Sequence, residues 1–136
     1  MNAPIAPDWI AIADDAALID GGAGIRFDMR LRMPRGPEAV TGFVVRHRGR
    51  VFGWVNQCRH VPVELDWTPG QFFDSAGIYL LCSVHGAAYA PDTGVCVSGP
   101  CQRDRLLPVP IEVRDGVIGW TPRAVLLPPH DNNNQT

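Results

Sequence analysis

The sequence contains no lysine: all twelve of its cationic side chains are arginine, against fourteen acidic ones, and the formal net charge is −2. A chain with this balance has no positive field that would hold nucleic acid or an anionic membrane. It also lacks any run of about eighteen apolar residues, the length that a membrane-spanning helix needs. We therefore expect neither nucleic acid nor a membrane among its partners.

The N-terminal region lacks basic residues as well, because Arg26 is the first cation of the chain. A secretory signal peptide begins with a basic segment, so this region does not resemble one. We expect a cytoplasmic protein. In that reducing compartment, cysteines are more often metal ligands than disulfides.

Long helical segments are lacking too. The 14 glycines and 13 prolines together make up about a fifth of the 136 residues. Such a density of helix breakers favours short strands joined by turns. Asp115-Gly116, between two apolar runs, is typical of a hairpin turn. The sequence predicts one all-β domain. We expect strands at residues 26–32, 42–48, 51–56, 78–81, 95–97, 106–113 and 117–120.

Three arginines alternate in the first predicted hairpin. Strand periodicity would place the guanidinium groups of Arg46, Arg48 and Arg50 together on one solvated face. His47, which lies among them, and His130, near the C-terminal end, are expected to be surface residues.

Two short cysteine–histidine pairs carry the chemistry of the sequence. Cys58 and His60 follow one predicted strand, and Cys82 and His85 follow another. If these strands are neighbours, both pairs can reach one metal centre. Thiolates together with imidazoles select zinc or an iron–sulfur cluster rather than magnesium or calcium.

The pattern C-x-H followed by C-x-x-H resembles the Rieske [2Fe–2S] family, in which two histidines replace two cysteines on one iron. The similarity extends to the residues after the second pair, Gly86 to Tyr89 and Thr93-Gly94, and to Gly99-Pro100, where the family has a segment over the cluster. A Cys₂His₂ zinc site is the alternative. Its usual spacing pairs cysteine with cysteine and histidine with histidine, which does not match.

The resemblance implies one [2Fe–2S] cluster per chain, with Cys58 and Cys82 on one iron and His60 and His85 on the other. It implies a sandwich of short antiparallel strands with an inserted cluster-binding subdomain. We expect an N-terminal segment at residues 1–24, the domain at 25–127 with the subdomain at about 58–99, and a tail at 128–136.

Departures from the family narrow this prediction. High-potential members carry an extra cysteine in each cluster loop and a serine hydroxyl near a bridging sulfide. Here neither loop has that cysteine, and Ala87 stands at the serine position. Fewer hydrogen bonds to the sulfurs stabilise the reduced cluster less. We expect a midpoint potential at the low end of the Rieske range, which runs from about −150 to +300 mV.

Low-potential members of this type are ferredoxins or domains of oxygenases, and a chain of this length has no room for an oxygenase's catalytic iron domain. The resemblance therefore implies an electron carrier between a reductase and an oxygenase or similar redox enzyme. The alternative is a redox-sensing subunit that binds a partner according to cluster state. We find no nucleophile–base pair, paired acids or phosphate-binding loop, and predict no catalysis of its own.

Two features stay open at this point. Cys96 and Cys101 flank Gly99-Pro100 and could form a disulfide, although a reducing compartment favours two reduced thiols. The loop at 61–81 is rich in aromatics. Trp67, Phe72 and Phe73 could form a docking patch, but aromatic side chains more often pack into a local cap over the core.

Overall fold

A computed structural model of the chain describes residues 9–58, 63–83, 86–100 and 104–130. These ranges form strands and a single 3-10 turn, η1 (Asp15–Ala17), so the described part contains no helix long enough to cross a membrane. The strands are β1 (Ile10–Asp14), β2 (Ile25–Met33), β3 (Gly36–His47), β4 (Arg50–Val55), β5 (Leu80–Leu81), β6 (Ala88–Tyr89), β7 (Cys96–Ser98), β8 (Ile111–Arg114), β9 (Val117–Trp120) and β10 (Leu126–Leu127).

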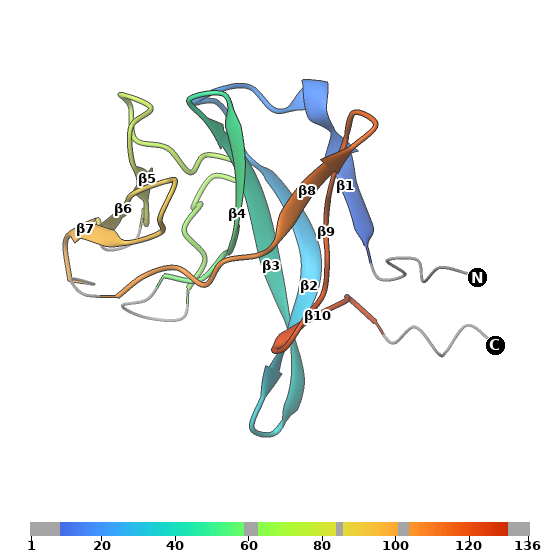
Figure 1. The fold of residues 1–136 in the computed structure, drawn as a ribbon. Coiled ribbons are helices and arrows are strands. Elements are labelled where there is room, and N and C mark those ends of the chain that lie inside the picture. The colour runs from blue at the N-terminus through green and yellow to red at the C-terminus, as the bar shows by residue number, and fades with distance from the viewer. Residues whose placement is uncertain (1–8, 59–62, 84–85, 101–103, 131–136) are drawn as a thin grey trace.

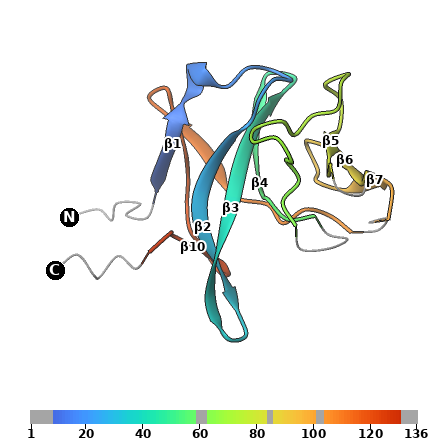
Figure 2. The same ribbon diagram turned by 180° about the vertical axis from the view of Figure 1, so that it is seen from behind.

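The strands form three antiparallel sheets (Figures 1 and 2). Two of them, in the orders β10-β2-β3-β4 and β1-β9-β8, contribute residues to two buried hydrophobic clusters. Met29 and Leu31 of β2 are buried there with Trp120 of β9. The alternating charged residues of β2 face outward or lie at the edge of the core, so the all-β prediction is confirmed.

The two hairpin turns predicted from the sequence have positive φ at both central residues: Arg48 and Gly49 at 53° and 81°, and Asp115 and Gly116 at 50° and 78°. Such turns match the right-handed twist of paired strands. The second hairpin is shorter than the prediction of 106–113, since β8 begins only at Ile111. Pro108 and Pro110 precede it, and proline has no N–H to donate to a ladder.

The expected solvated face of three arginines is wrong. Arg48 lies in the turn, and the Arg46 side chain is only 18% exposed. Its guanidinium donates to the backbone carbonyls of Leu18 and Asp15, both at 2.9 Å, and to the Asp15 carboxylate. Arg46 therefore fastens the η1 segment onto β3, a contact that strand periodicity cannot reveal.

Strand β1 lies in the segment that we expected to precede the domain. It pairs with β9, and Ile10 and Ile12 pack against the core. Two alternating apolar residues are a weak local signal, and only the pairing with β9 in the fold shows that this segment forms a strand. The domain limits otherwise stay a prediction.

The third sheet, β5-β6-β7, is inserted between β4 and β8 in the sequence and lies beside β4 (Figure 1). Its core packs against β3 and β4, where Phe43 stacks on Phe72 with 3.8 Å between ring centroids. The Trp54 indole donates to the carbonyl of Pro91 at 3.0 Å. The inserted subdomain is thus anchored by aromatic packing on the sandwich.

Candidate metal centre

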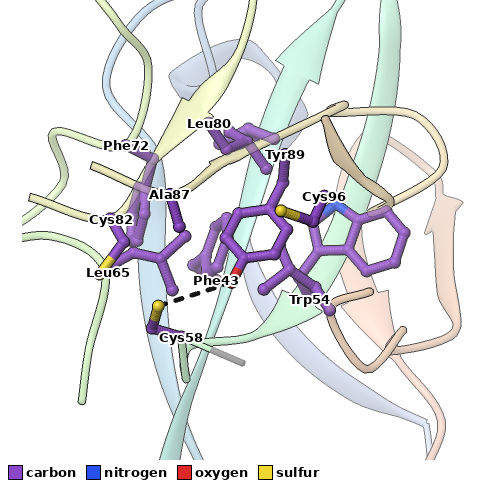
Figure 3. Packing of buried hydrophobic residues seen from close by; sticks show 12 residues of the cluster. Phe43, Trp54, Cys58, Leu65, Phe72, Leu80, Cys82, Ala87, Tyr89 and Cys96 are labelled. Atoms are coloured by element: carbon purple, nitrogen blue, oxygen red, sulfur yellow. Dashed lines mark hydrogen bonds between the residues drawn. The ribbon is translucent and has the colours of Figure 1, made fainter. Parts of the chain in front are cut away.

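Cys58 and Cys82 occupy equivalent places at the ends of strands. Cys58 follows β4, Cys82 follows β5, and both thiols are buried. Neither belongs to a disulfide. They are part of one packed cluster, and Figure 3 shows their sulfur atoms on the same edge of it. His60 and His85 lie outside the described residues.

Backbone hydrogen bonds fold each cysteine segment back on itself. The Cys58 N–H donates to the carbonyl of Val63 at 2.7 Å. The Cys82 N–H donates to Ala87 at 2.8 Å, and the N–H of Gly86 returns a bond to the Cys82 carbonyl at 2.9 Å. Each cysteine therefore begins a tight loop. We call the described residues 58 and 63–66 the first loop, and the described residues 82, 83, 86 and 87 the second loop.

The two loops are joined directly. The Ser83 N–H, next to Cys82, donates to the carbonyl of Leu65 at 3.0 Å. This bond brings the described parts of the two loops together, as an arrangement of two pairs around one metal centre requires.

Tyr89 adds a polar group that the sequence analysis missed. Its hydroxyl lies 3.5 Å from the Cys58 sulfur, and both residues are buried (Figure 3). A hydroxyl facing a thiolate can donate to it, while Ala87, fully buried nearby, has no donor. The aromatic after the second pair was noted as part of a motif, but a contact across 31 positions is visible only in the fold.

The donors fit an iron–sulfur cluster. Two buried thiols without a disulfide, one of them beside a phenolic donor, are ligands that soft metals prefer. Within the described ranges, no group of three or more His, Cys, Asp or Glu side chains could hold a metal. The rest of the predicted ligand set is the pair of histidines outside those ranges.

Cys96 differs from the expectation of a reduced thiol. It is disulfide-bonded and buried in the same cluster as Tyr89 and Trp54. Cys101, the proposed partner, lies outside the described residues. The expectation of a reduced thiol rested only on the redox state of the compartment. Whether a disulfide forms also depends on the backbone geometry around the cysteines.

The three aromatic residues of the loop at 61–81 have different environments. Phe72 is fully buried and Phe73 is half-buried, near the ring of His47. The expected local cap is therefore right for these two. Trp67 is 80% exposed, so it belongs to the surface.

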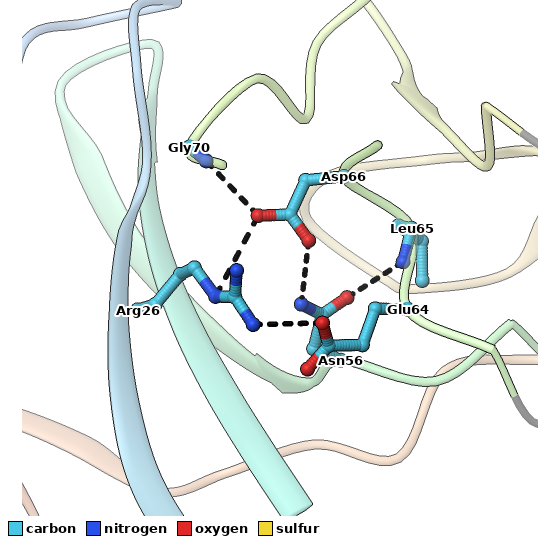
Figure 4. A network of polar contacts seen from close by, with 6 residues as sticks. All are labelled: Arg26, Asn56, Glu64, Leu65, Asp66 and Gly70. Atoms are coloured by element: carbon cyan, nitrogen blue, oxygen red, sulfur yellow. Dashed lines mark hydrogen bonds and ion pairs between the residues drawn. The ribbon is translucent and has the colours of Figure 1, made fainter. Parts of the chain in front are cut away.

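Buried polar side chains form a second feature that the sequence analysis missed. Within the described residues, Asn56 and Asp66 are the buried polar or charged side chains. They bond to each other and to residues of three segments (Figure 4). We call this set the Asp66 network; its members are Arg26, Asn56, Glu64, Leu65, Asp66 and Gly70.

Comparison with protein families finds a match between residues 31–114 and the family model of the Rieske [2Fe–2S] domain. That match covers more than half of the chain. Comparison with curated proteins finds no match.

Similar solved structures include the ferredoxin of carbazole 1,9a-dioxygenase from Nocardioides aromaticivorans IC177, with 21% identity, a TM-score of 0.64, and coverage of 85% of this chain and 98% of that one. The Sphingomonas yanoikuyae B1 ferredoxin shares 20% identity, with a TM-score of 0.61 and coverage of 84% and 98%. The terminal oxygenase of carbazole 1,9a-dioxygenase from Novosphingobium sp. KA1 shares 20%, with a TM-score of 0.63 and coverage of 90% and 31%. At these identities the likeness establishes the fold.

Proposed function

Because this chain belongs to the Rieske [2Fe–2S] domain family, we propose that it is a one-electron carrier of the ferredoxin type. The observation that carries the proposal is the pair of buried thiols of Cys58 and Cys82 at the start of two joined loops. We assign Cys58 and Cys82 to one iron and His60 and His85 to the other. The bound cluster supplies a site that takes up and releases one electron.

The chain's own residues adapt the site to this task. Burial of both thiols keeps water from the sulfur side of the site, and the backbone hydrogen bonds at Cys58 and Cys82 hold these two ligands in place. The Tyr89 hydroxyl lies 3.5 Å from the Cys58 sulfur and can donate to it once the thiol is a thiolate. This bond would partly offset the absence of a side-chain donor at Ala87. No bond to a substrate is needed for this function.

We propose a reductase as electron donor and a terminal oxygenase as acceptor. Two of the similar structures are ferredoxins, which this chain covers over 98% of their length. A further one is a complex of oxygenase and ferredoxin in carbazole 1,9a-dioxygenase. The oxygenase partner of the present chain is proposed from these relatives.

A cytoplasmic location, expected from the sequence, stays a proposal. Disulfides are rare in reducing compartments, so the disulfide at Cys96 argues against this location. Fractionation of the cells that produce the protein tests it.

Spectroscopy and rapid kinetics test the function. We expect red-brown protein containing iron and inorganic sulfide, a rhombic EPR signal on reduction, and a midpoint potential at the low end of the Rieske range. A midpoint above about +150 mV, in the upper half of that range, would contradict the low-potential prediction. Reduction by a flavin reductase of a dioxygenase system should be followed by reoxidation by the terminal oxygenase. Colourless, zinc-containing protein overturns the proposal. Binding that depends on cluster state without turnover supports the sensor instead.

Replacing Tyr89 with phenylalanine should lower the midpoint potential. A hydrogen bond to sulfur stabilises the reduced cluster, and a net bond of about 0.5–1.5 kcal/mol corresponds to roughly 20–60 mV for a one-electron couple. Tyr79→Phe is the matched control, because Tyr79 is a partly exposed tyrosine of the long loop. Equal potentials for wild type and Tyr89→Phe, measured by redox titration, would show that the hydroxyl does not tune the cluster.

Trp67→Ala should weaken transfer to the protein partner without changing the midpoint potential. Exposed tryptophans are enriched among the side chains that dominate interfaces, where truncation costs about 2 kcal/mol or more. Trp67 lies close in sequence to Leu65, which bonds to the second loop. The concentration giving half-maximal oxygenase turnover should rise about thirtyfold or more. Ile19→Ala, an exposed residue of the segment after η1, is the control.

A further inference from the structure

The Asp66 carboxylate is completely buried and uses both oxygens. Its Oδ1 accepts a hydrogen bond from the Asn56 side-chain amide at 2.8 Å. Its Oδ2 accepts from the Gly70 N–H at 2.9 Å and lies 3.7 Å from Nε of Arg26. A buried carboxylate is costly unless it is paired and hydrogen-bonded. Here the paired carboxylate fixes the orientation of the Asn56 amide and the Gly70 N–H, which an apolar side chain could not do.

The network continues from Asp66 to both loops. Asn56 passes the contact on, because its Oδ1 accepts from the Leu65 N–H at 2.8 Å. The carbonyl of the same Leu65 accepts from the Ser83 N–H of the second loop at 3.0 Å. One residue of the first loop is thus held on one side by Asn56 and holds the second loop on its other side.

The network is also fixed to the sandwich. Arg26 of β2 donates to Glu64 at 2.7 Å, across 38 positions of sequence. The Asn56 N–H donates to the carbonyl of Thr41 in β3 at 2.7 Å. The Gly70 carbonyl accepts from the Gly24 N–H at 2.8 Å. These bonds hold the loops at a fixed position relative to the sandwich, so their spacing does not depend on the loops alone.

We propose that Asp66 is a positioning residue, which acts through Asn56 and Leu65 to set the separation of the loops that begin at Cys58 and Cys82. This inference rests on the proposed function. Asp66 orients the Asn56 amide so that the Asn56 carbonyl oxygen faces Leu65. When this orientation is lost, the Leu65–Ser83 contact loosens, and the geometry around the metal changes with it.

The hydrogen-bond pattern suggests a sharp test. In Asp66→Asn, one carboxylate oxygen is replaced by an NH₂ group. This group faces either the Asn56 amide or the Gly70 N–H, both of which are donors, so one hydrogen bond is lost. In the double exchange Asn56→Asp/Asp66→Asn, the bond between the two side chains can form again with donor and acceptor reversed, and the N–H groups of Leu65 and Gly70 still find an acceptor oxygen each. Charge and volume of the pair are conserved.

The readouts are the EPR g-values and midpoint potential of the holoprotein, the rate of cluster loss to a chelator, and amide exchange at Leu65 and Ser83. We expect Asp66→Asn to shift the g-values and the potential and to speed cluster loss roughly tenfold, as the loss of one buried hydrogen bond implies. The double exchange should return all of them toward wild type. If Asp66→Asn does not fold, the double exchange alone decides: wild-type g-values support the proposal, and failure to bind a cluster overturns it.

Arg46→Gln is the matched control, since Arg46 makes comparable part-buried bonds to the η1 segment. It should lower thermal stability and leave the g-values and potential unchanged. Unchanged g-values, potential and amide exchange in Asp66→Asn would overturn the positioning role while leaving the carrier function intact. A wild-type protein without a rhombic signal would overturn the carrier function, and the inference with it.

Discussion

Replacing Cys58 or Cys82 with serine is expected to give protein that holds no [2Fe–2S] cluster and transfers no electrons. Each thiolate is one of two sulfur ligands that we assign to a single iron, and a serine hydroxyl is a harder donor that stays protonated near neutral pH. Both positions are buried, so no other side chain of the described core can take the place of the lost ligand without rearrangement. Iron and sulfide analysis and the visible spectrum measure the result.

Cys96→Ser is the matched control for these variants. Cys96 is a buried cysteine of the same packed cluster, but it is disulfide-bonded and not assigned to iron. Its folded fraction should keep a full complement of iron and sulfide. His60→Ala and His85→Ala should lose the cluster as the ligand cysteines do. Full iron loading in Cys82→Ser would contradict the ligand assignment.

Gly99→Ala is expected to destabilise the protein and its cluster site strongly. Gly99 has a φ of +94°, and an added Cβ would lie 2.8 Å from the Ala87 Cα and 3.2 Å from the Gly86 carbonyl oxygen. These are backbone atoms of the second loop, which the Cys82–Ala87 bond holds in place. Backbone strain alone costs about 1–3 kcal/mol. The clash adds to this cost, since either the backbone at Gly99 or the second loop must move.

Thermal unfolding and the rate of cluster loss measure this effect, and Gly116→Ala separates its two causes. Gly116 has a similar φ of +78°, but an added Cβ there meets nothing within 4 Å. We expect Gly116→Ala to lower stability by about 1–2 kcal/mol and to leave cluster retention unchanged. Equal behaviour of the two variants would mean that contact between Gly99 and the second loop is unimportant.

The success of the strand predictions depended on how local their cause is. The alternation in β2 and the Asp115-Gly116 turn are local patterns, and both were found at the expected places. The predicted start of β8 was wrong because two prolines there have no N–H to donate to a neighbouring strand. The predicted exposure of Arg46 was wrong because its hydrogen-bond partners lie 28 and 31 positions away in the sequence. Periodicity describes which face a residue is on, but not what covers that face.

The sequence by itself determined the all-β class and the two cysteine–histidine pairs, because turns, strand alternation and ligand spacing are properties of a few neighbouring residues. Only the tertiary structure decided which groups surround those pairs. The hydroxyl of Tyr89 beside Cys58, the buried carboxylate of Asp66 and the disulfide at Cys96 all result from how distant segments fold together. Burial removes water from the Tyr89 hydroxyl and the Asp66 carboxylate, so both must bond to protein groups. Burial is a property of the packed chain as a whole.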